Sequence, residues 1–434
     1  MRTGRLTLVA LLALLLSGCT PTTNQTEDPN APVTLSFWHG WSLPNDLAAL
    51  QTNIDRFTAA HPNVTVNLTP NVSDDKILQG LRSSTGPDVV SSFTTDAVGA
   101  LCGGALIDLN PLLKRDDISP SAFVPARIEY TQYQGTQCTL PLLGDAFGLY
   151  YNTDMFAAAG ITAPPKTWSE FTADAVKLTK ATGNSYDPVG FMPSFEGYES
   201  QPSVWMTQWS PTWLDKDGRS NLANDPKVAE FFTYTKSLVE ALGGYDALNS
   251  YRTTFGEEFS AENAFEAKKV AMQIDGEWRI ANIRDDGVDV KYAVAPLPVP
   301  DDQAANYGMG YLTGTVAGIS ARSAHQQAAW ELVKFLTTDT DALVSFANAI
   351  KNVPSTEASL ASTALEQDPN FAVFLDISKN PASVGIPASG NGGAYQTILN
   401  RFAADWESGT VPDLHAGLVV VDQEIDAANA QSSR

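Results

Sequence analysis

The stretch that decides the fold is VTLSFWHGWSLPNDLAALQTNIDRFTAAHPNVTVNL, residues 33–68. Residues 33–37 alternate in hydrophobicity and include β-branched side chains, which predicts a strand. Apolar side chains recur at helical spacing over residues 47–57, and residues 64–68 alternate again. Two strands joined by a helix pair in parallel, so this stretch predicts an α/β fold built on a mainly parallel sheet.

The first nineteen residues have the pattern of an export signal. Arg2 and Arg5 form a basic head, residues 6–16 are almost entirely apolar, and small residues precede Cys19. This run is shorter than the about 20 apolar residues that a spanning helix needs, so it predicts a secretory signal. The sequence LSGC at 16–19 resembles a bacterial lipobox, in which the cysteine becomes the lipid-modified N-terminus. An ordinary signal with a chance cysteine is the alternative.

The composition and length of the remaining chain limit its domain organisation and its partners. Residues 20–32 are mostly Thr, Asn, Pro, Asp and Glu, which cannot form a core and predict a flexible tether. The roughly 400 residues that follow exceed one simple core, so we expect two lobes. The formal net charge of -22 argues against a nucleic-acid partner, because its phosphates would be repelled.

Two cysteines, Cys102 and Cys138, remain if Cys19 is lipidated. Export places them in an oxidising compartment, where such a pair tends to form a disulfide. Two buried thiols are the alternative. Because the chain contains no CxxC motif, we expect the disulfide to be structural.

An ordered set of segments resembles the extracellular solute-binding proteins of family 1, the group that includes maltose-binding protein. The strongest segments are GLYYNTDMF at 148–156 and PPKTWSEF at 164–171. The other segments, in chain order, are 34–41, 86–90, 103–109, 272–278 and 329–336. The resemblance implies a two-lobed periplasmic-binding-protein type II fold, in which each lobe is a mainly parallel sheet flanked by helices. It also implies crossing hinge strands and closure of the lobes around a ligand.

The resemblance further implies where the lobes begin and end. Residues 33–145 plus 299–345 would form the N-terminal lobe, and residues 146–298 plus 346–430 the C-terminal lobe. The crossings would fall near residues 145–149, 296–300 and 344–351.

A sugar site needs aromatic rings for the apolar sugar faces and polar side chains for the hydroxyl groups. Trp38, His39 and Trp41 follow the first strand, where ligands bind in parallel sheets, although a lobe core is the alternative for a tryptophan. By resemblance, Asp96 and Asp145 occupy acidic ligand positions. The alternatives are a helix N-cap for Asp96 and an exposed loop acid for Asp145.

The second half of the chain supplies further candidates. Glu196 opens an aromatic-rich stretch with Trp205, Trp209 and Trp213, of which we expect one or two in the cleft and the others packed. By resemblance, Trp278 supplies a stacking ring, with Asp275 and Glu277 as weaker candidates beside it. The remaining candidates follow glycine-rich turns, for which plain turns are the alternative: Gly308, Met309, Tyr311, Tyr395 and Arg401.

These features predict a protein that binds a sugar and delivers it to the membrane subunits of an ABC permease. We expect a monomer, lipid-anchored to the outer face of the cytoplasmic membrane. We expect no cofactor, and no metal because the four histidines are scattered without HExxH. One alternative ligand is glycerol-3-phosphate or a glycerophosphodiester, although acidic candidates favour polyols. A secreted glycoside-active enzyme is a less favoured alternative, since paired carboxylates beside Trp also occur in glycosidases.

Overall fold

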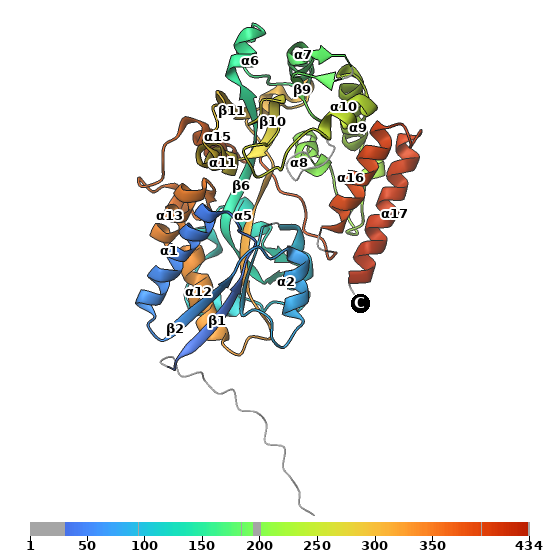
Figure 1. The fold of residues 1–434 in the computed structure, drawn as a ribbon. Helices are drawn as coiled ribbons and strands as arrows, with labels where there is room; N and C mark the ends of the chain where they lie inside the picture. Colours follow the sequence, from blue (N-terminus) through green and yellow to red (C-terminus); the bar gives the residue numbers. More distant parts are fainter. Residues whose placement is uncertain (1–30, 94, 184, 194–200, 392, 433–434) are drawn as a thin grey trace, which may run out of the picture.

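The computed structural model describes residues 31–93, 95–183, 185–193, 201–391 and 393–432. The structure also does not describe the side chains of residues 96, 126, 431 and 432. Cys19 and the predicted signal therefore lie outside the described residues, as do most of the predicted tether and Glu196. Figure 1 shows two lobes, one above the other, linked by a long central strand.

The lower lobe in Figure 1 begins with the predicted strand–helix–strand unit. Strand β1 (Val33–Trp38) pairs in parallel with β2 (Val64–Thr69), and α1 (Pro44–Ala60) connects them. Helix α1 buries Leu50, Ile54 and Phe57 on one face. Strand β3 (Val89–Ser92) lies parallel to β1 on its other side, so the predicted parallel arrangement is confirmed for these strands.

Strand β6 (Thr139–Asn152) belongs to both lobes, and nearly all of it is buried. Its first half pairs with β12 (Leu312–Ile319), which continues the sheet of the lower lobe to β3. Its second half pairs with β10 (Val270–Gly276) and β11 (Tyr292–Pro296) in the upper lobe. Strand β9 (Val189–Phe191) lies parallel to β10 at the outer edge. The predicted two-lobed architecture is therefore present.

Strand pairing marks where the chain changes lobe. On β6 the partner changes from β12 at Ala146 to β10 at Phe147, inside the predicted first crossing. The second predicted crossing, at 296–300, still contacts the upper lobe, because Val299 forms a bridge with Thr167. Pairing with the lower lobe resumes only at Leu312. The predicted lobe boundaries themselves stay a prediction.

Helices cover both sheets. Those of the lower lobe are α2 (Asp74–Leu81), α3 (Val98–Cys102), α4 (Asn110–Arg115), α5 (Pro125–Glu129), α12 (Gln326–Thr338), α13 (Thr340–Ile350) and α14 (Glu357–Leu360). Those of the upper lobe are α6 (Thr153–Ala158), α7 (Trp168–Leu178), α8 (Pro202–Met206), α9 (Pro226–Ala241), α10 (Tyr245–Arg252), α11 (Trp278–Asp286), α15 (Pro369–Lys379), α16 (Ala394–Glu407) and α17 (Leu414–Ser432). In Figure 1, α16 and α17 stand side by side at the flank of the upper lobe.

Short elements complete the chain. The short strands are β4 (Gln132–Tyr133), β5 (Thr136–Gln137), β7 (Ala181–Thr182), β8 (Ser185–Tyr186) and β13 (Val353–Pro354). The 3-10 turns are η1 (Thr95–Ala97), η2 (Pro120–Ala122), η3 (Thr207–Trp209), η4 (Leu222–Asn224) and η5 (Asp301–Asn306). None of the helices in the described ranges is long and apolar enough to span a bilayer.

The predicted disulfide is confirmed. Cys102, the last residue of α3, is bonded to Cys138, which directly precedes β6. The bond joins two segments separated by 36 positions in the sequence. It therefore ties a largely buried helix of the lower lobe to the strand that both lobes share.

Candidate functional site

Trp38, His39 and Trp41 lie at the carboxyl end of β1, where Trp38 is the last, half-buried residue of the strand and not part of the loop after it as predicted. His39 is fully buried between the rings of Phe37 and Trp41, with centroids 5.6 and 5.5 Å away. Neither ring nitrogen of His39 has a hydrogen-bond partner among the described residues, and burial lowers its pKa to about 4, so the ring is neutral near pH 7. Trp41 is only 4% exposed, and Trp38 packs against Gly80 of α2. Ligand contact by these three predicted residues stays a prediction.

An exposed aromatic ring lies beside this cluster at the carboxyl end of β3. Phe93 is 40% exposed and packs edge-on against Trp41, with ring centroids 5.3 Å apart. The Phe93 ring also lies so close to Gly40 that a Cβ there would be 2.3 Å from it. Phe93 is not among the predicted residues, although its place directly after a buried strand is a signal for the carboxyl edge of the sheet. Asp96 lies nearby in η1, with its side chain outside the described part.

Two predicted ligand carboxyls, Asp145 and Glu277, meet at the junction of the lobes. Glu277 accepts hydrogen bonds from the backbone amide of Ala146 at 2.9 Å and from the Asn352 side chain at 3.1 Å. The same Asn352 amide donates to Asp145, whose side chain also hydrogen-bonds to Glu277. Both carboxyls are buried, Asp145 at 6% exposure and Glu277 at 0%. The structure thus brings the two residues together but gives them partners within the protein.

Burial shapes the protonation of this pair. Desolvation raises the pKa of Asp145 to about 7, and the nearby Arg127 guanidinium opposes the rise. Desolvation also raises the pKa of Glu277 well above its usual value, and the adjacent Asp145 raises it further. Two buried carboxyls in contact cannot both ionise without repulsion. The pair therefore retains at least one proton near neutral pH, and Asn352 bridges it.

The other predicted residues around β10 have structural partners. Asp275 is fully buried and forms an ion pair with Arg279 at 2.7 Å, and Arg279 pairs with Glu266 at 3.1 Å. Trp278 begins α11, is partly buried, and packs edge-on against Phe147 at 5.4 Å. Trp278 therefore lies at the lobe junction next to Glu277. Asp275 instead forms its ion pair within the upper lobe.

Trp205 and Trp209 lie inside an aromatic cluster of the upper lobe. The Trp209 ring stacks on Trp168 with centroids 5.2 Å apart and planes 13° from parallel. The Trp205 ring contacts Trp168 and Phe231 edge-on. Trp205 is 0% and Trp209 4% exposed, so neither presents an open ring face.

The candidates after the second predicted crossing divide between interior and surface. Met309 and Tyr311 are buried, and the Tyr311 ring packs against Phe147 at 5.1 Å. Gly308 has a φ of 107°, which favours glycine, so the turn alone accounts for it. Arg401 is exposed on α16 and pairs with Glu424 of α17.

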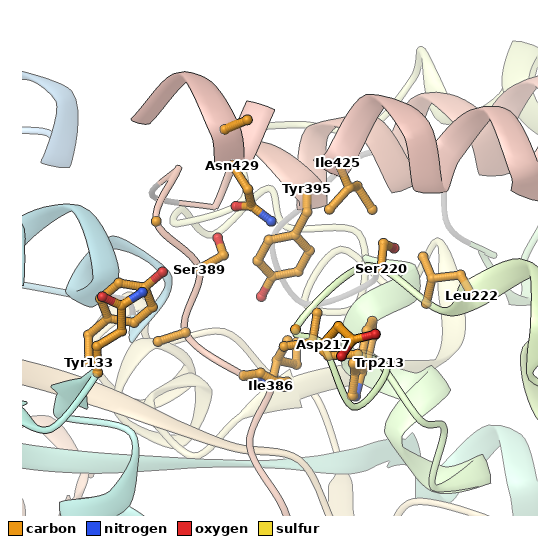
Figure 2. A pocket seen from close by; sticks show the side chains of 17 residues that line it. Tyr133, Trp213, Asp217, Ser220, Leu222, Ile386, Ser389, Tyr395, Ile425 and Asn429 are labelled. Carbon is orange, nitrogen blue, oxygen red and sulfur yellow. The ribbon is translucent and has the colours of Figure 1, made fainter. Parts of the chain in front are cut away.

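A pocket of about 420 Å³ lies between the lobes. Tyr133 and Gln134, from the β4–β5 hairpin of the lower lobe, form one wall, and Trp213 of the upper lobe lies opposite. Figure 2 shows the predicted Tyr395 pointing into the space between them from the start of α16. The rest of the lining is Leu214, Asp217, Gly218, Ser220, Leu222, Ile386, Pro387, Ala388, Ser389, Gly390, Ile425, Asn429 and Ala430.

The chemistry of this pocket is aromatic and uncharged, apart from one acid. Its lining combines three aromatic rings with hydroxyl and amide groups, and Asp217 is its sole ionisable carboxyl among the described residues. No lysine or arginine of the described chain belongs to the lining. Of the three tryptophans in the aromatic-rich stretch, Trp213 lines the pocket. Tyr133 and Gln134 were missed, since a short hairpin gives no hint of which lobe it will face.

The described part of the chain contains no cluster of metal-ligating side chains. Across the described ranges, no three His, Cys, Asp or Glu side chains are close enough together to hold an ion. The described part of the pocket offers aromatic, hydroxyl and amide contacts, which suit reversible binding of an organic solute.

Known proteins resemble this chain in sequence and in fold. Residues 40–342 match the family described as bacterial extracellular solute-binding protein. A putative binding protein of Brucella abortus is 27% identical over 286 residues, covering 64% of this chain and 66% of the relative, slightly under two thirds of its length. A probable ABC transporter-binding protein of Deinococcus radiodurans is 26% identical over 312 residues, covering 70% of this chain and 71% of the relative.

A solved structure shares the fold. The solved structure of CpMnBP1 with mannotriose bound matches with a TM-score of 0.78 at 24% identity, covering 92% of this chain and 100% of that one. The family match spans well over half of the sequence and includes β6, which joins the lobes. The chain therefore belongs to the family of bacterial extracellular solute-binding proteins.

Proposed function

We propose that this protein is an exported, lipid-anchored component of an ABC importer that captures a carbohydrate between its lobes. The observation that carries the proposal is the interlobe pocket, which Tyr133 of the lower lobe and Trp213 of the upper lobe line together. A ligand that contacts both walls favours the closed arrangement, because only that arrangement offers both sets of contacts. Release would follow when the importer favours the open one.

The lining supports a sugar as the ligand. The partly exposed rings of Trp213 and Tyr133 suit the apolar faces of pyranose rings, and Ser389 and Asn429 offer groups that pair with hydroxyls. The volume of about 420 Å³ suits a monosaccharide or a short oligosaccharide. The related fold with mannotriose bound supports the same class of ligand.

The alternative ligand, glycerol-3-phosphate or a glycerophosphodiester, lacks support in the pocket. A phosphate group is usually held by arginine, lysine or clustered backbone amides. The described lining has no lysine or arginine, and its one carboxylate, Asp217, is ion-paired with Lys216 at 2.7 Å. We therefore propose a neutral sugar over a phosphorylated one.

The location rests on the N-terminal sequence and on the family. LSGC at 16–19 supports lipid attachment at Cys19, and residues 20–32 would tether the lobes outside the membrane. We propose that the protein acts as a monomer and delivers its sugar to membrane permease subunits. The relative named as an ABC transporter-binding protein supports that partnership.

A thermal-shift screen of the full-length protein in detergent tests this function. The panel contains mono- and oligosaccharides, polyols, glycerol phosphodiesters and amino acids. We expect the melting temperature to rise with the concentration of one sugar class, because the ligand binds the folded state. Stabilisation only by phosphodiesters would replace the sugar with the alternative ligand, and stabilisation by no compound in the sugar class would contradict the proposal.

Recovery of the sugar separates binding from catalysis. The sugar that stabilises the protein is incubated with it for hours and then analysed by chromatography. A binding protein returns the sugar unchanged. Hydrolysis of the sugar would instead identify a glycoside-active enzyme.

A further inference from the structure

The pocket wall that carries Trp213 is the segment 212–224 between η3 and α9, which ends in the 3-10 turn η4. Within the segment, Leu214 forms a bridge with Ser220, and the Asp215 carboxylate accepts hydrogen bonds from the Asp217 and Arg219 amides, so the turn itself is held by local contacts. At its far end, Asp225 caps α9 and also accepts a hydrogen bond from the Thr212 amide. The position of the wall therefore depends on contacts with neighbouring elements.

Helix α17 supplies those contacts through two aspartates. Asp422 accepts hydrogen bonds from the backbone amides of Leu222 and Ala223, each at 2.9 Å, using its two carboxylate oxygens. The Ser220 hydroxyl also donates to Asp422, at 2.5 Å. Asp426, one turn farther along the helix, accepts from the Ser220 backbone amide at 2.9 Å. Two carboxylates thus receive four hydrogen bonds from one side of the pocket wall.

The same face of α17 also lines the pocket. Asp422, Ile425, Asp426 and Asn429 recur at helical spacing, so they share one face. Ile425 and Asn429 belong to the pocket lining, and Figure 2 shows both beside Tyr395. The helix therefore holds the wall with its aspartates and completes the pocket with the residues next to them.

A backbone hydrogen bond links the held segment to Trp213. The amide of Asn221, which lies between Ser220 and Leu222, donates to the carbonyl oxygen of Trp213 at 3.0 Å. This bond couples the position of residues 220–223 to that of the Trp213 backbone. The aspartates themselves are not among the residues that line the pocket.

We propose that Asp422, supported by Asp426, is a positioning residue that fixes Trp213 for sugar binding, an inference that rests on the proposed function. Its carboxylate sets where residues 220–223 lie, and these residues set the place of the Trp213 ring. Asp422 acts through the pocket wall and makes no contact with the sugar. In this proposal, helix α17 determines where Trp213 lies and so contributes to sugar binding.

The experiment compares Asp422→Ala with Glu424→Ala in the full-length protein. Glu424 lies on the same helix but pairs with Arg401 on α16, so its removal disturbs α17 without touching the pocket wall. Two quantities are measured: the affinity for the sugar found in the thermal-shift screen, and hydrogen exchange in the peptides that contain Leu222 and Ala223. We expect Asp422→Ala to weaken binding at least 10-fold and to accelerate exchange in those peptides. Glu424→Ala should change neither quantity by more than about 2-fold.

The outcomes separate the two proposals. Absence of sugar binding by the unaltered protein counts against the proposed function. Unchanged affinity in Asp422→Ala, or equal weakening in Glu424→Ala, would overturn the positioning role while leaving the proposed function intact. If Asp422→Ala fails to fold, Asp422→Asn replaces it. Asparagine keeps one acceptor oxygen, so the affinity of the Asp422→Asn protein for the sugar should fall, but less than 10-fold. An affinity equal to that of the unaltered protein would also overturn the positioning role.

Discussion

Trp213 and Trp205 come from one aromatic-rich stretch but have different surroundings. Trp213 is partly exposed in the pocket, whereas Trp205 is fully buried among other rings. Replacing Trp213 by Ala should weaken sugar binding by about 1–3 kcal/mol, because a stacking surface is lost. Isothermal titration calorimetry measures the affinity, and the melting temperature without sugar should change little.

Trp205→Ala is the matched control within the same stretch. Removing a buried tryptophan leaves a cavity, so the free energy of unfolding should fall by about 3–5 kcal/mol. Urea denaturation measures this loss. If Trp213→Ala left the affinity unchanged, the assignment of the pocket as the sugar site would be wrong.

For individual residues, the sequence predicted which side chains are candidates for the site, but not which other side chains they contact. Asp145 and Glu277 were both identified as candidates, yet their mutual contact and the Asn352 bridge join residues more than 70 positions apart. Asp275 likewise faces Arg279 and Glu266 within the upper lobe. Such partners depend on tertiary contacts, which local patterns do not specify. Tyr395 lines the pocket, and its contact with a ligand stays a prediction.

Among the structural elements, the disulfide between α3 and the start of β6 is open to a direct test. The double variant Cys102→Ser, Cys138→Ser should lower the free energy of unfolding by about 2–4 kcal/mol, because the unfolded chain gains the freedom of a 36-position loop. Urea denaturation of both proteins under oxidising conditions measures the difference. Equal stability of the two proteins would show that the bond contributes nothing to the fold.

The elements of the lower lobe were predictable because their signals are local. Alternation and helical spacing over residues 33–68 predicted β1, α1 and β2, which the structure contains. The second crossing was harder to place. The proline-rich run at 296–300 indicates the absence of a regular strand. It does not indicate which lobe the run contacts, and Val299 pairs with Thr167 of the upper lobe.

At the scale of the whole molecule, the buried carboxyl pair couples stability to pH. The pKa of Asp145 is raised to about 7, whereas an unfolded aspartate titrates near 4. Between these values the folded state holds a proton that the unfolded state has released. The stability contributed by this group is therefore fully present below about pH 4 and is lost as the pH rises through about 7.

The Asp145→Asn variant isolates that dependence. As the pH rises from 5 to 7.5, the unaltered protein should lose stability relative to the variant by on the order of 1 kcal/mol per pH unit. Urea denaturation of both proteins at several pH values gives the difference, in which the titrating groups remote from Asp145 largely cancel, while Glu277 contributes through its contact with Asp145. Parallel pH profiles for the two proteins would contradict the raised pKa.

We propose that a sugar binds between the lobes, in the pocket lined by Tyr133, Trp213 and Tyr395. The most direct test is a crystal structure of the protein with the sugar that gives the largest thermal shift. We predict density for a pyranose ring stacked on Trp213 and contacting the lower lobe at Tyr133 or Gln134. A sugar bound outside this pocket, with Trp213 and Tyr133 free of contact, would contradict the account.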